Sequence, residues 1–363
     1  MNCKLTATRL TTTWNRYMSV VSLTFGLLYA MPSQAQELSL YGGTSRANAP
    51  SESTYSWGFT YLQPLDAYNA LSFSWINEGH YTDHHPDGFA LQYWRRIWLF
   101  NDRLALAGGL GAYNFFDTTA SDEGKRYADV HGWALIYSLS AAWYTRTPWF
   151  YQIRVNRINT FHSLNITNVM FGIGYQLGGT NHAGAIPDYL AQASGSRDEL
   201  TVLAGKTEVN SLHSPGAFAK SVEYRHGFGS YVDATLTWLD EGSTSLSRRN
   251  GAATEIWLSR GFFNERLRLA VGAGPYVAID TYQVAGGMNT EDKVSALVTM
   301  TASYQFARHW IVRGSWNRVL TGYNKDSDVF LAGVGYRSKP VAPARTMLGT
   351  TLFHKPLPRS QNL

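Results

Sequence analysis

The sequence predicts an all-β protein, a transmembrane antiparallel β-barrel built as two tandem eight-stranded barrels. Three observations predict this fold class. Segments of about ten residues alternate between apolar and small or polar side chains, as strands with two different faces do. No run of 18 apolar residues follows residue 35, so membrane-crossing helices are not expected. A long internal repeat, finally, indicates that one module occurs twice.

The N-terminus has the pattern of a secretory signal peptide over residues 1–35. Three basic residues precede an apolar run from Met18 to Ala30, and Ser33-Gln34-Ala35 forms a small-x-small cleavage site. A membrane anchor is the alternative, but this run is shorter than the ~20 residues that a spanning helix needs. We therefore expect an exported protein, cleaved near Ala35-Gln36.

The net charge of +5 is set by the two ends of the chain. Residues 1–35 and 339–363 contain basic residues and no acidic ones, which leaves the body between them slightly acidic. We therefore expect no nucleic-acid partner. Cys3 is the only cysteine and lies in the signal, so thiolate metal sites and disulfides are excluded from the mature chain.

Residues of the two halves recur at a nearly constant offset. Trp75-x-x-Glu78-Gly79 recurs as Trp238-x-x-Glu241-Gly242, and Gly111-x-Tyr113-x-x-x-Asp117-Thr118 recurs as Gly274-x-Tyr276-x-x-x-Asp280-Thr281, both at an offset of 163. The offset is 162 upstream and 161 downstream, where Asn156-Arg157 matches Asn317-Arg318. This period is far longer than that of a solenoid repeat, so each copy is expected to be a whole folding unit.

Each copy is expected to contain eight strands. In the first copy they span 37–46, 54–64, 69–80, 87–100, 103–117, 129–145, 149–162 and 167–178, and in the second 199–209, 218–228, 231–242, 250–263, 266–281, 293–306, 310–322 and 327–338. In the sixth strand Trp133, Leu135, Tyr137 and Leu139 face one way, opposite Ala134 and Ser138. A soluble β-sandwich is the alternative, but aromatic residues near strand ends and small residues on the other face favour a membrane barrel.

Loop lengths predict the topology. The connections at 65–68, 101–102 and 146–148 are short, whereas those at 47–53, 81–86, 118–128 and 163–166 are mostly longer and polar. Because short turns face the periplasm in such barrels, odd-numbered strands are expected to run outward.

The polar linker at 179–198 is much longer than the other periplasmic turns. It favours two separate barrels, at 36–178 and 199–338, over the alternative of one sixteen-stranded barrel. Residues 339–363 are expected to form a flexible periplasmic tail.

Side-chain parity places a set of polar residues at the outer mouth of each barrel. These are Glu78, Tyr113, Asp117, Arg154, Asn156 and Thr160 in the first copy, and Glu241, Tyr276, Asp280, Arg313, Asn317 and Thr321 in the second. One interpretation is a pocket for a surface glycan, a lipopolysaccharide headgroup or a cation. The other is an internal ion-pair network that fills a narrow barrel, with Arg154 neutralising the carboxylates.

Histidines gather in the third loop of the first copy, at His80, His84 and His85. Imidazole can bind metal, but the second copy has Ser247-Arg248-Arg249-Asn250 at this place. We therefore expect no metal site, and no motif indicates a cofactor.

Taken together, the chain resembles outer-membrane β-barrel proteins. The hairpin Phe161-His162-Ser163 resembles the catalytic end of lipid A deacylases, which carry His-x-Ser on a late strand and Glu on a neighbouring one. That resemblance implies acyl hydrolysis with His162 and Ser163 as the catalytic pair. Here the two residues are adjacent, so on a strand they face opposite sides, which does not favour a base and nucleophile in contact.

Arg157 and Arg318 are expected on the outward face near the outer rim. They would contact lipopolysaccharide phosphates or extend to the interface as ordinary basic side chains. The expected partners are outer-membrane lipids and lipopolysaccharide, the barrel-assembly machinery during insertion, and a surface glycan or small solute.

The leading functional hypothesis is a non-enzymatic role in envelope structure or surface binding. A passive channel for small polar solutes is the alternative, and it requires the single sixteen-stranded closure. A lipopolysaccharide acyl hydrolase is the third hypothesis.

Overall fold

The computed structural model describes residues 36–48, 51–121, 126–160, 163–177, 197–211, 213–228, 231–263, 265–284 and 287–338. Within these ranges all regular elements are strands, and no helix there could cross a membrane. The predicted signal peptide (1–35), the predicted tail (339–363) and nearly all of the predicted linker (179–198) lie outside the described residues.

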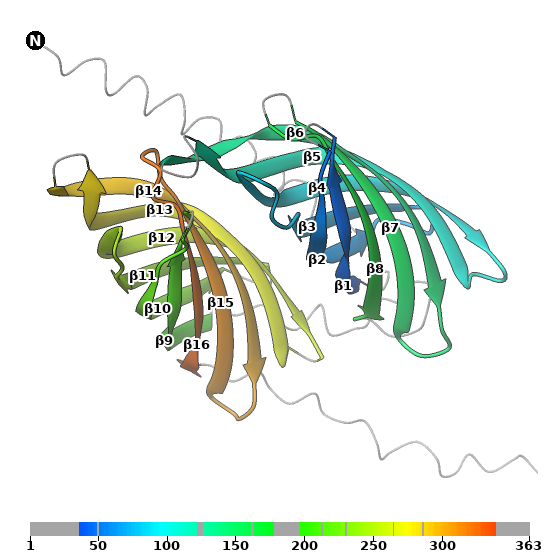
Figure 1. Ribbon diagram of the computed structural model, residues 1–363. Helices are drawn as coiled ribbons and strands as arrows, with labels where there is room; N and C mark the ends of the chain where they lie inside the picture. The colour runs from blue at the N-terminus through cyan, green and yellow to red at the C-terminus, as the bar shows by residue number, and fades with distance from the viewer. Residues whose placement is uncertain are drawn as a thin grey trace, which may run out of the picture. The chain divides into compact units, whose positions relative to one another are not determined.

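Eight antiparallel strands form the first barrel, in blue to green in Figure 1. They are β1 (Glu37–Ala47), β2 (Ser53–Pro64), β3 (Asn69–Asn77), β4 (His84–Leu99), β5 (Leu104–Ser121), β6 (Arg126–Tyr144), β7 (Trp149–Thr160) and β8 (Ile166–Gln176). Each strand pairs with its neighbours in sequence, and β1 pairs with β8 from Glu37↔Gln176 to Ala47↔Ile166. The barrel is therefore closed without the second half of the chain.

The second barrel repeats this order with β9 (Arg197–Val209), β10 (Gly216–Phe228), β11 (Val232–Ser243), β12 (Ser247–Phe262), β13 (Leu267–Val284), β14 (Gly287–Gln305), β15 (Trp310–Leu320) and β16 (Ser327–Arg337). Here β9 lies between β10 and β16 and closes the ring. The predicted fold of two eight-stranded barrels is confirmed, and the sixteen-stranded alternative is wrong because β1 pairs with β8.

Two hairpins are longer than predicted. The loop expected at 118–128 is largely strand, because β5 and β6 stay paired as far as Ser121↔Arg126. In the second barrel β13 and β14 stay paired as far as Val284↔Gly287. A bilayer needs only about ten residues per tilted strand, so these strands of 18 and 19 residues extend well beyond it. The linker also ends earlier than predicted, since β9 begins at Arg197.

The two ends of each barrel are named by the strands that they join. We call the end that joins β1 to β2, β3 to β4, β5 to β6 and β7 to β8 the loop end, and the opposite end the turn end; the second barrel is named in the same way. At the turn end of the first barrel only residues 100–103 join β4 to β5, and 145–148 join β6 to β7.

The outer surface of each barrel is apolar. Large exposed side chains include Leu40, Ile97, Leu139, Phe171, Val202, Leu236, Val277 and Phe330. Aromatic residues gather near the turn end, among them Trp143, Trp149, Tyr151, Trp310 and Tyr336. Water-soluble proteins rarely expose a continuous apolar surface of this kind, whereas membrane barrels have an apolar band edged by aromatic residues.

Small and large side chains complement one another inside the barrels. A Cβ added at Gly109 would lie 2.8 Å from the indole of Trp94, and one added at Gly272 would lie 2.4 Å from that of Trp257. Each indole is held in place, because Trp94 donates to Ser72 Oγ at 2.8 Å and Trp257 to Thr235 Oγ1 at 3.0 Å. The glycines thus leave the space that each ring occupies.

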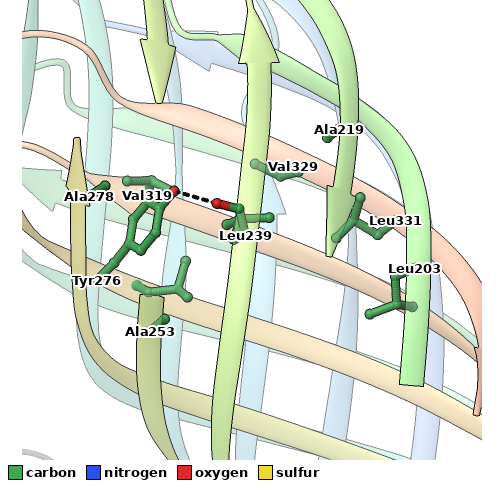
Figure 2. Close-up of a cluster of buried hydrophobic side chains, with 10 residues drawn as sticks. Leu203, Ala219, Leu239, Ala253, Tyr276, Ala278, Val319, Val329 and Leu331 are labelled. Carbon is green, nitrogen blue, oxygen red and sulfur yellow. Dashed lines mark hydrogen bonds between the residues drawn. The ribbon is translucent and has the colours of Figure 1, made fainter. Parts of the chain in front are cut away.

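In each barrel an inward-facing tyrosine reaches past the neighbouring strand to the next one. Tyr276 of β13 reaches over Ala253 of β12 and donates from its hydroxyl to the carbonyl oxygen of Leu239 in β11 at 3.1 Å (Figure 2). Tyr113 of β5 makes the equivalent contact with the Ile76 carbonyl at 3.5 Å. Around Tyr276, Figure 2 shows buried aliphatic side chains from several strands, including Leu203, Ala219, Val319, Val329 and Leu331.

Candidate functional site

Each barrel places one glutamate inside its loop end. Glu78 directly follows β3 and is only 1% exposed. Gly79 has a positive φ of 81°, which favours glycine, so the chain turns immediately after the carboxylate. Glu241 and Gly242 repeat this arrangement, with a φ of 77° at the glycine. The shared Glu-Gly pair therefore provides a buried carboxyl group in both barrels.

The environment of Glu78 favours its neutral form. Burial raises the pKa of this carboxyl to about 8; a hydrogen bond with the Tyr113 hydroxyl lowers it, and the carboxylates of Asp87 and Asp117 raise it. Among the described residues Oε1 of Glu78 has no hydrogen-bond partner. Burial thus favours the protonated form of Glu78.

Asp117 of β5 is held by three groups at the loop end. Nδ1 of His84 lies 2.7 Å from Oδ2, and the Ser163 hydroxyl donates to the same oxygen at 2.7 Å. The backbone N–H of His85 donates to Oδ1 at 3.2 Å. His84, which was expected in the third loop of the first copy, is therefore a partner of this carboxylate.

In the second barrel an arginine neutralises the corresponding carboxylates. Nη1 of Arg249 donates to both oxygens of Glu241 at 3.1 Å, and Nε donates to Oδ2 of Asp280 at 3.1 Å. Ser327 donates its hydroxyl to Glu241 and accepts from Arg249. All four side chains are buried, so this group forms a compact internal ion-pair cluster.

The two loop ends differ because of one position on β4 and β12. Arg249 pairs across the sheet with Asp280, and Pro86, 163 residues earlier, pairs with Asp117. The first barrel therefore has no guanidinium at this place. Arg249 was not among the predicted site residues because the strand was expected to begin at residue 250. The alternation of side chains, continued back from Ala253, places Arg249 inside the barrel.

Arg154 does not lie beside the loop-end carboxylates. It donates from Nη1 to Thr60 Oγ1 at 2.9 Å, and its guanidinium lies 4.5 Å from the ring centroid of Tyr41 and 4.7 Å from that of Trp94. The prediction that Arg154 neutralises Glu78 is therefore wrong. Its long side chain stacks on aromatic rings deeper in the barrel.

Arg313 also lies away from the loop end. It belongs to a buried ion-pair network that includes Glu199, Glu223, Arg225, Asp233, Arg268 and Arg337. Arg313 itself pairs with Glu199 and Glu223, and it is 0% exposed. Charged side chains thus fill the part of the second barrel's interior that lies near the turn end.

Near the turn end, the interior of the first barrel contains fewer charged side chains than that of the second. Nη1 of Arg96 lies 3.1 Å from Oε1 of Glu37, which also accepts from the Tyr144 hydroxyl at 3.0 Å. A cavity of about 20 Å³ remains there, lined by these residues and by Trp94 and Arg154. Such a space holds about one water molecule, so it is no passage.

The predicted amides and hydroxyls have local partners. Asn156 accepts from Ser138 at 2.7 Å, and Asn317 donates to the Val329 carbonyl at 3.0 Å. Thr160 donates to the Leu164 carbonyl at 3.2 Å and so supports the connection between β7 and β8. Thr321 is buried just after β15. These contacts are typical of structural polar groups inside a barrel.

Of the predicted catalytic pair, only Ser163 lies within the described residues. His162 lies outside the described residues, and Ser163 directs its hydroxyl to Asp117. His84 contacts the same carboxylate oxygen, so Asp117 lies between the imidazole and the hydroxyl. A nucleophilic serine needs its base within hydrogen-bond reach, and Asp117 fills that position here. The described residues contain no group of three metal-ligating side chains.

Arg157 and Arg318 have different partners on the two barrels. Arg157 donates to Asn48 Oδ1, Asn159 Oδ1 and Thr167 Oγ1, each at 3.0 Å. Arg318 instead pairs with the carboxylate of Asp328 at 3.1 Å. Arg157 is therefore held by neutral oxygens, and Arg318 is neutralised.

The fold and its surfaces define the class of protein. Charged and polar groups lie inside two closed barrels, and apolar side chains cover the outside. Polar groups inside and apolar groups outside are what a protein needs when its outer surface contacts lipid. In lipid, only helices and closed barrels satisfy all backbone hydrogen bonds. The chain is therefore an integral membrane protein of the β-barrel class.

Comparison with known proteins finds distant similarities. No protein-family model matches the chain, and no curated protein matches it. Among solved structures it is similar to the N-terminal β-barrel domain of Pseudomonas aeruginosa OprF, with 14% identity over 40% of this chain and 99% of that chain and a TM-score of 0.32. It is also similar to an outer membrane channel from Pseudomonas putida F1 (14% identity, 85% and 96% covered, TM-score 0.21). The assignment of class rests on this chain's own surfaces and strand order.

Proposed function

We propose that this protein is a non-conducting and non-enzymatic outer-membrane barrel that serves envelope structure or surface binding. The observation that supports this most directly is the filling of both interiors. Trp94 and Arg154 occupy the first interior, and the network around Arg313 occupies the second. Narrow eight-stranded barrels filled by side chains leave no aqueous passage.

The two alternatives have less support. The channel hypothesis depends on a single sixteen-stranded closure, whereas β1 pairs with β8. The hydrolase hypothesis pairs Ser163 with His162, whereas the Ser163 hydroxyl donates to the carboxylate of Asp117, which also contacts His84. The loop ends carry the long β5–β6 and β13–β14 hairpins, and we propose that they face outward and form the binding surface.

Single-channel conductance in planar bilayers tests this proposal. The purified mature protein should give no steps under conditions in which a porin from the same detergent inserts and conducts, with insertion of the protein confirmed by flotation with vesicles. Stable, reproducible steps would contradict a filled interior and make transport the leading function.

Lipid A analysis tests the enzymatic alternative. Cells that express the wild-type chain and cells that express Ser163→Ala should contain identical lipid A by mass spectrometry. Loss of acyl chains that depends on Ser163 would overturn the non-enzymatic assignment.

A further inference from the structure

A groove lies on the outer surface of the first barrel. It has a volume of about 410 Å³, within the range of ligand sites, and almost all of its lining is apolar. Cross-strand pairing explains its form. Tyr93, Leu110, Tyr137 and Arg157 make one row across β4 to β7, and the row nearer the turn end contains Gly108, Leu139 and Val155. Gly108 leaves a gap in this second row.

Gly108 faces the open exterior. A Cβ added there would have only a methyl carbon of Leu139 within 4 Å, at 4.0 Å. The walls are large side chains that remain exposed, with Leu139 at 69% and Tyr93 at 47%. A trough of this kind in the apolar band of a membrane barrel suits one flexible hydrocarbon chain.

Arg157 provides a charged group at the loop-end side of the groove. Its Nε and Nη1 donate to neutral oxygens of Asn48, Asn159 and Thr167, and no carboxylate of the described residues pairs with it. These bonds hold the guanidinium in place without neutralising it. A fixed, uncompensated guanidinium beside an apolar groove is complementary to a phosphate attached to an acyl chain.

The second barrel lacks both features at the corresponding positions. Its second row reads Val271, Met300 and Trp316, so Val271 fills the place of Gly108. Arg318 corresponds to Arg157, but its cross-strand neighbour is Asp328, where Arg157 has Thr167. The groove and the free positive charge thus occur together on the first barrel.

We propose that this groove binds lipid A, with an acyl chain over Gly108 and a phosphate on Arg157. The inference rests on the proposed outward direction of the loop ends, because that direction puts Arg157 in the outer leaflet, where phosphorylated acyl-glucosamine lipids reside. It does not depend on the conductance result, so a conducting protein that still binds lipid A would refute only the proposed function.

Native mass spectrometry of the full chain in detergent, with lipid A or phosphatidylglycerol added, tests the proposal. Wild-type protein should bind one lipid A. Gly108→Val, which copies Val271, and Thr167→Asp, which copies Asp328, should each weaken binding at least tenfold, about 1.4 kcal/mol. Val271→Ile on the second barrel is the matched control and should change nothing.

Two results of this experiment would overturn the proposal that the groove binds lipid A. Equal binding of phosphatidylglycerol would show a general phospholipid site, and undiminished binding by both variants would show that lipid A lies elsewhere; either result overturns the proposal. The substituted side chains face lipid, so heat-modifiable mobility should be unchanged. Arg157→Gln provides a third, independent variant, which should also bind lipid A at least tenfold more weakly than the wild-type protein.

Discussion

Replacing each loop-end glutamate by glutamine should have opposite consequences in the two barrels. Glu241→Gln removes a carboxylate that accepts two hydrogen bonds from Arg249, whereas the ion pair between Arg249 and Asp280 remains. Breaking a buried pair costs about 3–5 kcal/mol. Because Asp280 remains, we expect a loss near the lower limit, about 3 kcal/mol.

Glu78→Gln should behave differently because burial already favours the neutral form of Glu78. Its pKa is raised to about 8 by burial, so between the unfolded value of 4.5 and 8 the folded protein binds the extra proton. This contribution favours folding below the unfolded pKa, and it is lost as pH rises to about 8, by roughly 1.4 kcal/mol per pH unit. Glutamine does not titrate. The free energy of unfolding of the variant should therefore equal that of the wild type near pH 5 and be larger than it at pH 9.

Urea unfolding followed by tryptophan fluorescence, with heat-modifiable mobility as a second readout, measures both effects. Each variant leaves the other barrel unchanged, which gives an internal control. The reasoning is refuted if Glu78→Gln destabilises the protein at pH 9, or if Glu241→Gln has no effect at pH 7.

Two further predictions concern the interiors. Gly109→Val should destabilise the first barrel by about 1–3 kcal/mol, because the added carbon meets the Trp94 ring at 2.8 Å. Gly108→Val on the outward face is the control and should cost little stability. The midpoints of thermal gel-shift curves measure both variants. Arg313→Ala should cost about 3–5 kcal/mol in urea, since it removes a buried guanidinium that pairs with both Glu199 and Glu223 and leaves them to Arg337 and Arg225. Lys206→Ala in the exposed pair with Glu208 should cost less than about 1 kcal/mol, and an equal loss from both would contradict the burial argument.

Much of the fold could be predicted because strand alternation is a local property. The sixth predicted strand placed Trp133, Leu135, Tyr137 and Leu139 on one face, and all four are exposed to the exterior. The shared Glu-Gly pair and the shared tyrosines also occupy equivalent places in the two barrels. Period and spacing are sufficient for these features.

The partners of the site residues could not be predicted in the same way. Parity gives the face of a side chain but not its height or reach, so Arg154 was assigned to Glu78 when its guanidinium stacks on Tyr41 and Trp94. Comparison of the two copies finds only what they share. Arg249 and His84 each occur in one copy, and for that reason the groups that balance the carboxylates were missed.

The position of Glu199 bears on how the chain selects its own closure during assembly. Glu199 lies on β9, the first strand of the second barrel, and its partners Arg313 and Arg337 lie on the last two strands. If β9 joined β8 in one larger ring, these ions would be separated from the charges that satisfy them. The electrostatic cost of that separation disfavours the larger ring. The ion pairs of Glu199 therefore favour closure of β9 onto β16.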